Sequence, residues 1–190
     1  MGFDPFRTAG LALTWWPNRL VACCFGQLFG ARGFWGLLTG PNPTDRAIQG
    51  SKRHLICDGF GIPLAIKLTG ANCHDSTQAL PLLDAIPPLQ GPRGRPRCRP
   101  DCIVGDRAYD AEHIRRALRA RHILPLLARR NTEHGSGLGQ WRWVVERAFA
   151  WLNQFRRLRV RYEKRADMHL AFLTLGCILI CWKFLRAEQA

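Results

Sequence analysis

A helical stripe of apolar residues late in the chain constrains the fold more than any other sequence feature. From about residue 140, apolar side chains recur at i, i+3, i+4, i+7 and i+10, the spacing of one face of an α-helix. They are Val145, Ala148, Phe149, Leu152 and Phe155. A helix with one apolar face has to lay that face on another apolar layer. The chain therefore needs a second layer for this helix, and short apolar segments upstream can form it.

Several of these segments predict β-strands that alternate with helices. His54–Cys57 and Ile62–Leu68 predict two strands, joined by a hairpin turn at Asp58–Gly61. Further strands are predicted at 102–104 and 123–127, and helices at about 76–86, 111–121 and 169–185. This order predicts an α/β fold, a mixed sheet flanked by helices, and the 190 residues suffice for one domain.

The charge of the chain predicts a polyanionic partner. The formal net charge is +14, and nucleic acid is the partner that such a charge favours. Residues 106–165 hold 15 Lys and Arg against 6 Asp and Glu, so this part carries much of the excess. The basic run within it supplies the predicted DNA contacts, which are Arg156, Arg157, Arg159, Arg161, Lys164 and Arg165.

The eight cysteines form no convincing disulfide or zinc framework. Cys98 and Cys102 have a loose metal-like spacing without matching Cys or His pairs, which disfavours a structural zinc and indicates reduced thiols in a cytoplasm. The apolar segment Leu170–Trp182 is about 13 residues, short of the roughly 20 that a spanning helix needs. It predicts a buried core helix, so we expect a cytoplasmic protein with no membrane partner.

Two carboxylates are the candidate catalytic residues. Asp106 follows the apolar segment 102–104, and ligands gather at the carboxyl ends of strands in α/β sheets. Asp110 is expected to cap the next helix, which would leave Asp106 without a structural role. Glu146 lies on the edge of the helical stripe, and it would either face the sheet or pair with Arg142 one turn away. Acids that hold magnesium, set among cations that hold phosphate, suit an enzyme acting on DNA.

Several short motifs follow one another along roughly residues 39–186. They are Thr39–Asp45, Gly50–Leu55, Gly61–Leu64, Leu68–Asn72 with His74 and Asp75, Gly105–Asp110, Val145–Asn153, Phe155–Tyr162 and Leu170–Leu173. In this order they resemble bacterial insertion-sequence transposases of the DDE type, in particular the insertion-sequence-five group.

The resemblance implies an RNase H-like fold in which three acids bind two divalent metals, Mg²⁺ or Mn²⁺. Asp106 matches the second acid, Glu146 the third, and Arg142 the basic residue of the signature around the third acid. The tyrosine and lysine of that signature would fall at Gly139 and Asn153 and are absent. The implied partners are DNA, as transposon ends and target, and further copies of a transposase. His74 and Asp75 are supporting candidates, either closing a loop or assisting the acids.

The match to this family fails at the first acid. In the family it lies on the first strand, but residues 19–38 contain no Asp or Glu. We therefore expect an irregular, non-family segment at 1–38, a first strand that is missing or degraded, and the C-terminal part of a catalytic domain at 39–186. This predicts a transposase that lacks its beginning and has little or no activity. The alternatives are a non-catalytic DNA-binding remnant, which would interfere with an intact transposase by mixed assembly, and a zinc-containing structural module built on Cys98 and Cys102.

Overall fold

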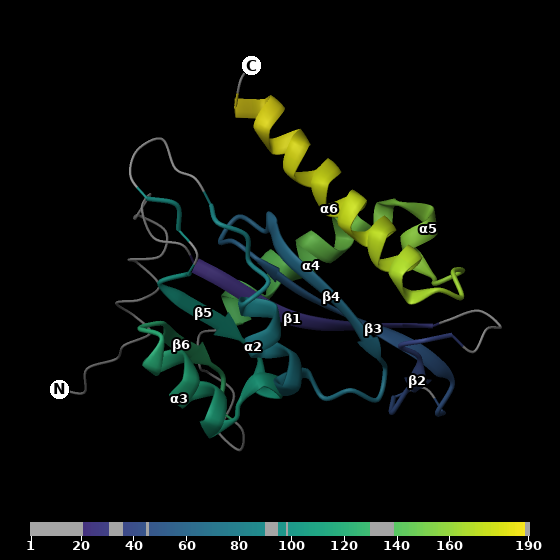
Figure 1. Cartoon of the computed structure of the whole chain (residues 1–190), viewed down its shortest axis with the longest axis horizontal. Coiled ribbons are helices and arrows are strands. Elements are labelled where there is room, and N and C mark those ends of the chain that lie inside the picture. Colours follow the sequence, from purple (N-terminus) through teal and green to yellow (C-terminus); the bar gives the residue numbers. More distant parts are fainter. Residues whose placement is uncertain are drawn as a thin grey trace.

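A mixed β-sheet forms the centre of the protein (Figure 1). The structure is a computed structural model and describes residues 21–30, 36–44, 46–89, 95–97, 99–129 and 139–188. Within these residues the strands are β1 (Val21–Gly30), β2 (Gly40–Pro41), β3 (Gln49–Cys57), β4 (Pro63–Gly70), β5 (Cys102–Gly105) and β6 (Leu124–Leu127). The longer helices are α3 (Glu112–Ala120), α4 (Gly139–Gln154) and α6 (Ala166–Glu188), and the short ones are η1 (Asp75–Gln78), α2 (Ala79–Leu83), η2 (Arg107–Tyr109) and α5 (Arg156–Arg159).

Strand β1 lies in the middle of the sheet. It runs antiparallel to β3 on one side and parallel to β5 on the other. β4 extends the sheet antiparallel to β3, and β6 extends it parallel to β5, so the order across the sheet is β4, β3, β1, β5, β6. β2 pairs with the start of β3. The carboxyl ends of β1, β5 and β6 therefore point the same way.

Helices cover both faces of this sheet. In Figure 1, α2 and α3 lie in front of the strands and α4 passes behind them. Alternation along β5 separates the two cores, because Val104 packs with the buried residues of α4 while Ile103 packs with those of α2 and α3. The predicted helical stripe is confirmed for four of its five residues. Val145, Ala148, Phe149 and Leu152 are buried, and the three larger ones each contribute of the order of 1.5–3 kcal/mol by leaving water. Phe155 lies one residue beyond the end of α4 and is half-buried.

The predicted α/β architecture is confirmed. The first strand was expected to be missing or degraded, and the expectation that it is missing is wrong. Val21–Gly30, inside the segment expected to be irregular, forms the central strand β1. The β3–β4 hairpin also matches its prediction. The Asp58 carboxylate accepts hydrogen bonds from the Phe60 and Ile62 N–H groups at 2.9 and 2.8 Å, and Gly61 supplies the positive φ of 81° that closes the turn. Cys98 lies outside the described residues.

Helix α6 differs from the buried core helix that the sequence predicts. It is longer than expected, and Leu173 and Ile180 are buried while Ile178, Trp182 and Leu185 are more than half exposed. Figure 1 shows its C-terminal half running out beyond the sheet. The segment 166–186 has a mean hydropathy of 1.8 with 22% of its most apolar window buried, so its length and composition would permit a membrane span. One such helix is weak support for a membrane.

Candidate site at the carboxyl end of β5

Asp106 lies directly after β5, where β5 and β6 end together while β1 continues past them to Gly30. Cys24 of β1 and Leu127 of β6 are the register partners of Gly105, one residue earlier. Asp106 itself is exposed and has an extended backbone, with φ −78° and ψ −178°. The predicted position at a strand end is therefore confirmed, and it places a carboxylate beside the central strand.

Neither aspartate of this segment has the structural role that the sequence suggests. Asp106 caps η2, because its Oδ1 accepts a hydrogen bond from the Ala108 N–H at 3.0 Å. The expectation that Asp106 has no structural role is wrong. Helix α3 begins at Glu112, and its N-cap residue Ala111 has no side-chain cap, while Asp110 accepts two hydrogen bonds from Arg115 at 2.9 and 2.7 Å. The difference arises because the short 3₁₀ helix η2 lies between β5 and α3.

Glu146 is exposed on α4, next to the buried Val145. Val145 and Val104 share one hydrophobic core, and Val104 is two residues before Asp106. Glu146 thus lies on the helix that covers the sheet face to which Val104 points, and Asp106 follows the strand of Val104. The side chain of Arg142 lies outside the described residues, so the Glu146–Arg142 pair is untested.

The described residues do not assemble a metal-binding set of three acids, histidines or cysteines. Strand β1 reads Val-Ala-Cys-Cys-Phe-Gly-Gln-Leu-Phe-Gly and carries no carboxylate. Cys24 of β1 is the register partner of Gly105, so β1 passes beside Asp106 without a carboxylate.

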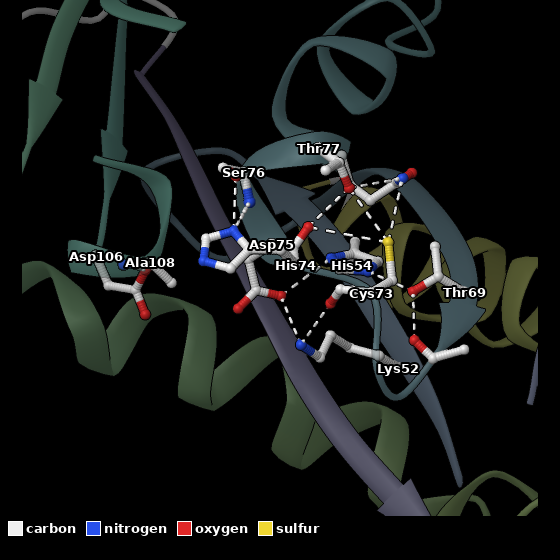
Figure 2. Close-up of polar contacts among 12 residues, drawn as sticks. Lys52, His54, Thr69, Cys73, His74, Asp75, Ser76, Thr77, Asp106 and Ala108 are labelled. Carbon is white, nitrogen blue, oxygen red and sulfur yellow. Dashed lines mark hydrogen bonds and ion pairs between the residues drawn. The ribbon is translucent and has the colours of Figure 1, made fainter. Parts of the chain in front are cut away.

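A buried polar network lies beside this strand end (Figure 2). Oδ1 of Asp75 lies 3.2 Å from Nζ of Lys52 and 3.6 Å from Nδ1 of His54, and both of these residues come from β3. Nε2 of His54 lies 2.8 Å from the Thr69 hydroxyl. Burial lowers the pKa of His54 to about 4, with Asp75 opposing and Lys52 adding to the shift, so this imidazole is neutral at pH 7.

His74 and Asp75 both stabilise the segment that follows β4. Nδ1 of His74 contacts Ser76, its hydroxyl at 2.6 Å and its N–H at 3.2 Å, which caps η1. Asp75 ties η1 to β3, and η1 in turn neighbours η2, the turn that Asp106 caps. Sequence reasoning missed Lys52 and His54. The available signal was weak, because Lys52 and His54 belong to a polar run that only its pairing reveals as part of the strand Gln49–Cys57.

The predicted DNA-contacting run divides into exposed and buried members. The exposed residues are Arg156, Arg157, Arg159, Lys164 and Arg165. Two of them have acidic partners, because Arg157 contacts Glu163 at 3.1 Å and Arg165 contacts Asp167 at 2.5 Å. Arg161 is 2% exposed and its guanidinium donates to groups of the protein itself, so the prediction that it contacts DNA is wrong.

Comparison with known proteins gives consistent matches. The family model described as "Transposase DDE domain" matches residues 26–182. An inferred transposase for insertion sequence element IS402 of Burkholderia cepacia is 58% identical over 175 residues, 92% of this chain and 83% of that protein. Another, for element IS6501 of Brucella ovis, is 28% identical over 136 residues, 68% of this chain and 96% of that protein. The family match begins inside β1, upstream of the residue 39 expected from the sequence motifs.

Among solved structures, a chain of the simian T-cell lymphotropic virus intasome in complex with the PP2A regulatory subunit B56 gamma is similar at a TM-score of 0.47 and 16% identity. The similarity covers 85% of this chain and 47% of that chain.

Proposed function

Because this chain belongs to the family of proteins with a transposase DDE domain, we propose that it binds the DNA of an insertion sequence and cuts it weakly or not at all. The function of this family is DNA transposition, and its members generally use divalent metal ions. The residues of this chain support DNA binding better than they support metal-dependent cleavage.

The strand arrangement supports an RNase H-like catalytic domain. The order β4, β3, β1, β5, β6, with β1 antiparallel to β3 and parallel to β5, is the order that this fold requires. In that fold the acids lie at the central strand, at the end of its parallel neighbour and on a helix packed against the sheet. Asp106 follows β5 and Glu146 lies on α4, positions that match the second and third of these and support their assignment as the remaining pair of acids.

The absence of a carboxylate from β1 carries the proposal of impaired cleavage. Two acids neutralise less positive charge than three, so binding of two Mg²⁺ or Mn²⁺ ions should weaken. The residues present do not fit the two-metal site of the family, since no set of three donors exists among the described residues. Asp106 and Glu146 would retain at most a weakened affinity for a single ion.

Exposed cations after α4 carry the proposal of DNA binding. Arg156, Arg157 and Arg159 lie together on the single turn of α5, and Lys164 and Arg165 follow in the exposed segment before α6. Contacts of Lys and Arg with phosphates supply affinity that falls steeply with salt and does not depend on base sequence. We place this protein in the cytoplasm with the DNA, as a homo-oligomer or in mixed assemblies with an intact transposase.

A binding measurement tests the DNA-binding half of the proposal. Fluorescence anisotropy with a labelled duplex should show binding that weakens as salt rises, and the double substitution Asp106→Asn with Glu146→Gln should leave it unchanged. Asn at position 106 keeps an oxygen that can cap η2. Replacing Arg156, Arg157 and Arg159 together by Ala should weaken binding and flatten its salt dependence. Binding that is absent or independent of salt would refute this half.

The same double variant separates the two candidate functions. An active transposase would lose DNA cleavage in the double variant, whereas a non-catalytic DNA-binding protein would show equal binding and no cleavage in both forms. The missing acid of β1 favours the second outcome.

A further inference from the structure

Aromatic and cationic side chains alternate along one face of α4. The Arg147 guanidinium carbon lies 4.5 Å from the ring centre of Trp143 and 5.1 Å from that of Trp151. The ring of Trp151 meets Phe184 of α6 with 5.2 Å between ring centres. Trp143, Arg147 and Trp151 are spaced by four residues, so they follow one another along the helix. We call these four side chains, Trp143, Arg147, Trp151 and Phe184, the α4 stack.

Contacts with the β3–β4 hairpin hold the centre of the α4 stack in place. A terminal N–H of Arg147 donates a hydrogen bond to the Phe60 carbonyl oxygen at the tip of the hairpin. Gly61 lies so close to α4 that a Cβ there would approach the Val144 carbonyl oxygen to 2.9 Å. The guanidinium is therefore fixed by a backbone acceptor and by two rings, which preorganises the adjacent Trp143 ring.

The α4 stack is closed at one end and open at the other. Trp151 is partly buried and Phe184 packs against it, whereas Trp143 is 52% exposed. The ring of Phe60, on the hairpin that Arg147 contacts, is 72% exposed. A fixed and half-exposed tryptophan therefore ends an ordered column of rings and charge. Glu146 lies three residues further along the same helix, on the neighbouring turn.

We propose that the open face of Trp143 stacks against an unpaired nucleobase at the end of a DNA duplex. This proposal rests on the proposed function, because it assumes that the protein binds DNA. Every base has a π-face that can extend such a column, and aromatic stacking gives affinity with little sequence preference. The net charge of +14 and the Arg147 guanidinium complement the phosphates beside such a base better than they would complement a basic or apolar protein.

The consequence concerns the position of the DNA strand. A base held on Trp143 would bring its own backbone within one helical turn of Glu146. Trp143 would then act as a positioning residue that distinguishes an opened duplex end from a closed one. Duplex binding by the arginines of α5 would not make this distinction, because phosphate contacts are the same in both.

Equilibrium binding to matched DNA ends tests the proposal. The two probes are a blunt duplex and the same duplex with a short single-stranded 3′ overhang, both read by fluorescence anisotropy. The unmodified protein should prefer the overhang, and Trp143→Ala should lose that preference, with a loss of about 5- to 100-fold in affinity for the overhang probe. Trp143→Phe, which keeps a ring, should retain most of it. Trp182→Ala is the matched control, since Trp182 is 58% exposed on α6 outside the α4 stack.

An abasic overhang shows whether the base itself is the ligand. Removing the bases should weaken binding to the unmodified protein and have little effect on Trp143→Ala, so the two losses should not add. Equal losses from Trp143→Ala with the normal and abasic overhangs would overturn the proposal. So would an equal loss from Trp182→Ala, which would indicate a general apolar or protein-contacting surface. Unchanged salt-dependent binding to the blunt duplex in either case would leave the proposed function standing.

Discussion

Nη1 of Arg161 lies 2.8 Å from the Ser51 hydroxyl oxygen and joins the segment after α5 to a strand 110 residues earlier in the chain. The same guanidinium donates to four backbone carbonyl oxygens, those of Leu37, Leu38, Glu163 and Lys164. One buried side chain therefore holds the start of β3, the loop before β2 and the entry to α6 together.

Replacing Arg161 by Ala should destabilise the fold. Buried acceptors that lose their donor cost about 1–3 kcal/mol each, so we expect a loss of about 3 kcal/mol or more in the free energy of unfolding. Urea denaturation followed by circular dichroism measures this. Arg156→Ala is the control, because this arginine is exposed and should change stability by less than about 0.5 kcal/mol. Similar stability of the two variants would contradict the assigned role of Arg161.

Replacing the exposed Arg159 by Ala should weaken DNA binding without destabilising the fold, in contrast to the replacement of Arg161. We expect nearly unchanged stability, a weaker affinity for duplex DNA of any sequence, and a slope of log K against log salt that is smaller by about one. Its hydrogen bond to the Asn153 carbonyl is on an exposed side chain, so its loss should cost little. Affinities measured at several salt concentrations give the slope. An unchanged slope would exclude Arg159 from the phosphate contacts.

Acid should weaken the fold through His54. The folded protein holds this imidazole neutral, with a pKa of about 4 against an ordinary 6.5, so the unfolded chain binds the proton more readily. The contribution of His54 is therefore fully present above pH 6.5 and is lost as the pH falls towards 4, by up to about 3 kcal/mol. Unfolding free energies at several pH values should show this loss in the unmodified protein and less of it in His54→Gln. Parallel pH profiles for both proteins would contradict it.

Replacing Gly61 by Ala should strain the hairpin tip against α4. The residue has a φ of 81°, and an added Cβ would lie 2.9 Å from the Val144 carbonyl oxygen. We expect a loss of about 1–3 kcal/mol in the free energy of unfolding. Gly59→Ala in the same turn is the matched control, because the positive φ of this turn belongs to Gly61. Thermal denaturation of both variants gives the comparison, and equal midpoints would argue against the close approach.

The sequence predicted those elements whose residues carry a local pattern. The stripe from Val145 to Leu152 and the Asp58–Gly61 turn are such cases, since helical spacing and turn chemistry depend on neighbours in the chain. β1 was missed because its ten residues show no alternation and become a strand by pairing with β3 and β5. Non-local pairing of this kind leaves little trace in a single segment.

Residue roles that depend on tertiary contacts could not be predicted from the sequence. The sequence placed Asp106 at the end of a strand but could not show the η2 turn that it caps. It also grouped Arg161 with its exposed neighbours, because a run of arginines looks uniform until the fold buries one of them. The missing acid of β1 was visible in the sequence, whereas the place of β1 beside Asp106 required the structure.

Incubation of the protein with duplex DNA carrying the terminal repeats of the element, in Mg²⁺ or Mn²⁺, tests the central claim most directly. We predict salt-dependent binding without strand cleavage, in the unmodified protein and in Asp106→Asn alike. Efficient cleavage by the unmodified protein that disappears in Asp106→Asn would contradict this claim, because two acids would then suffice where three were thought necessary.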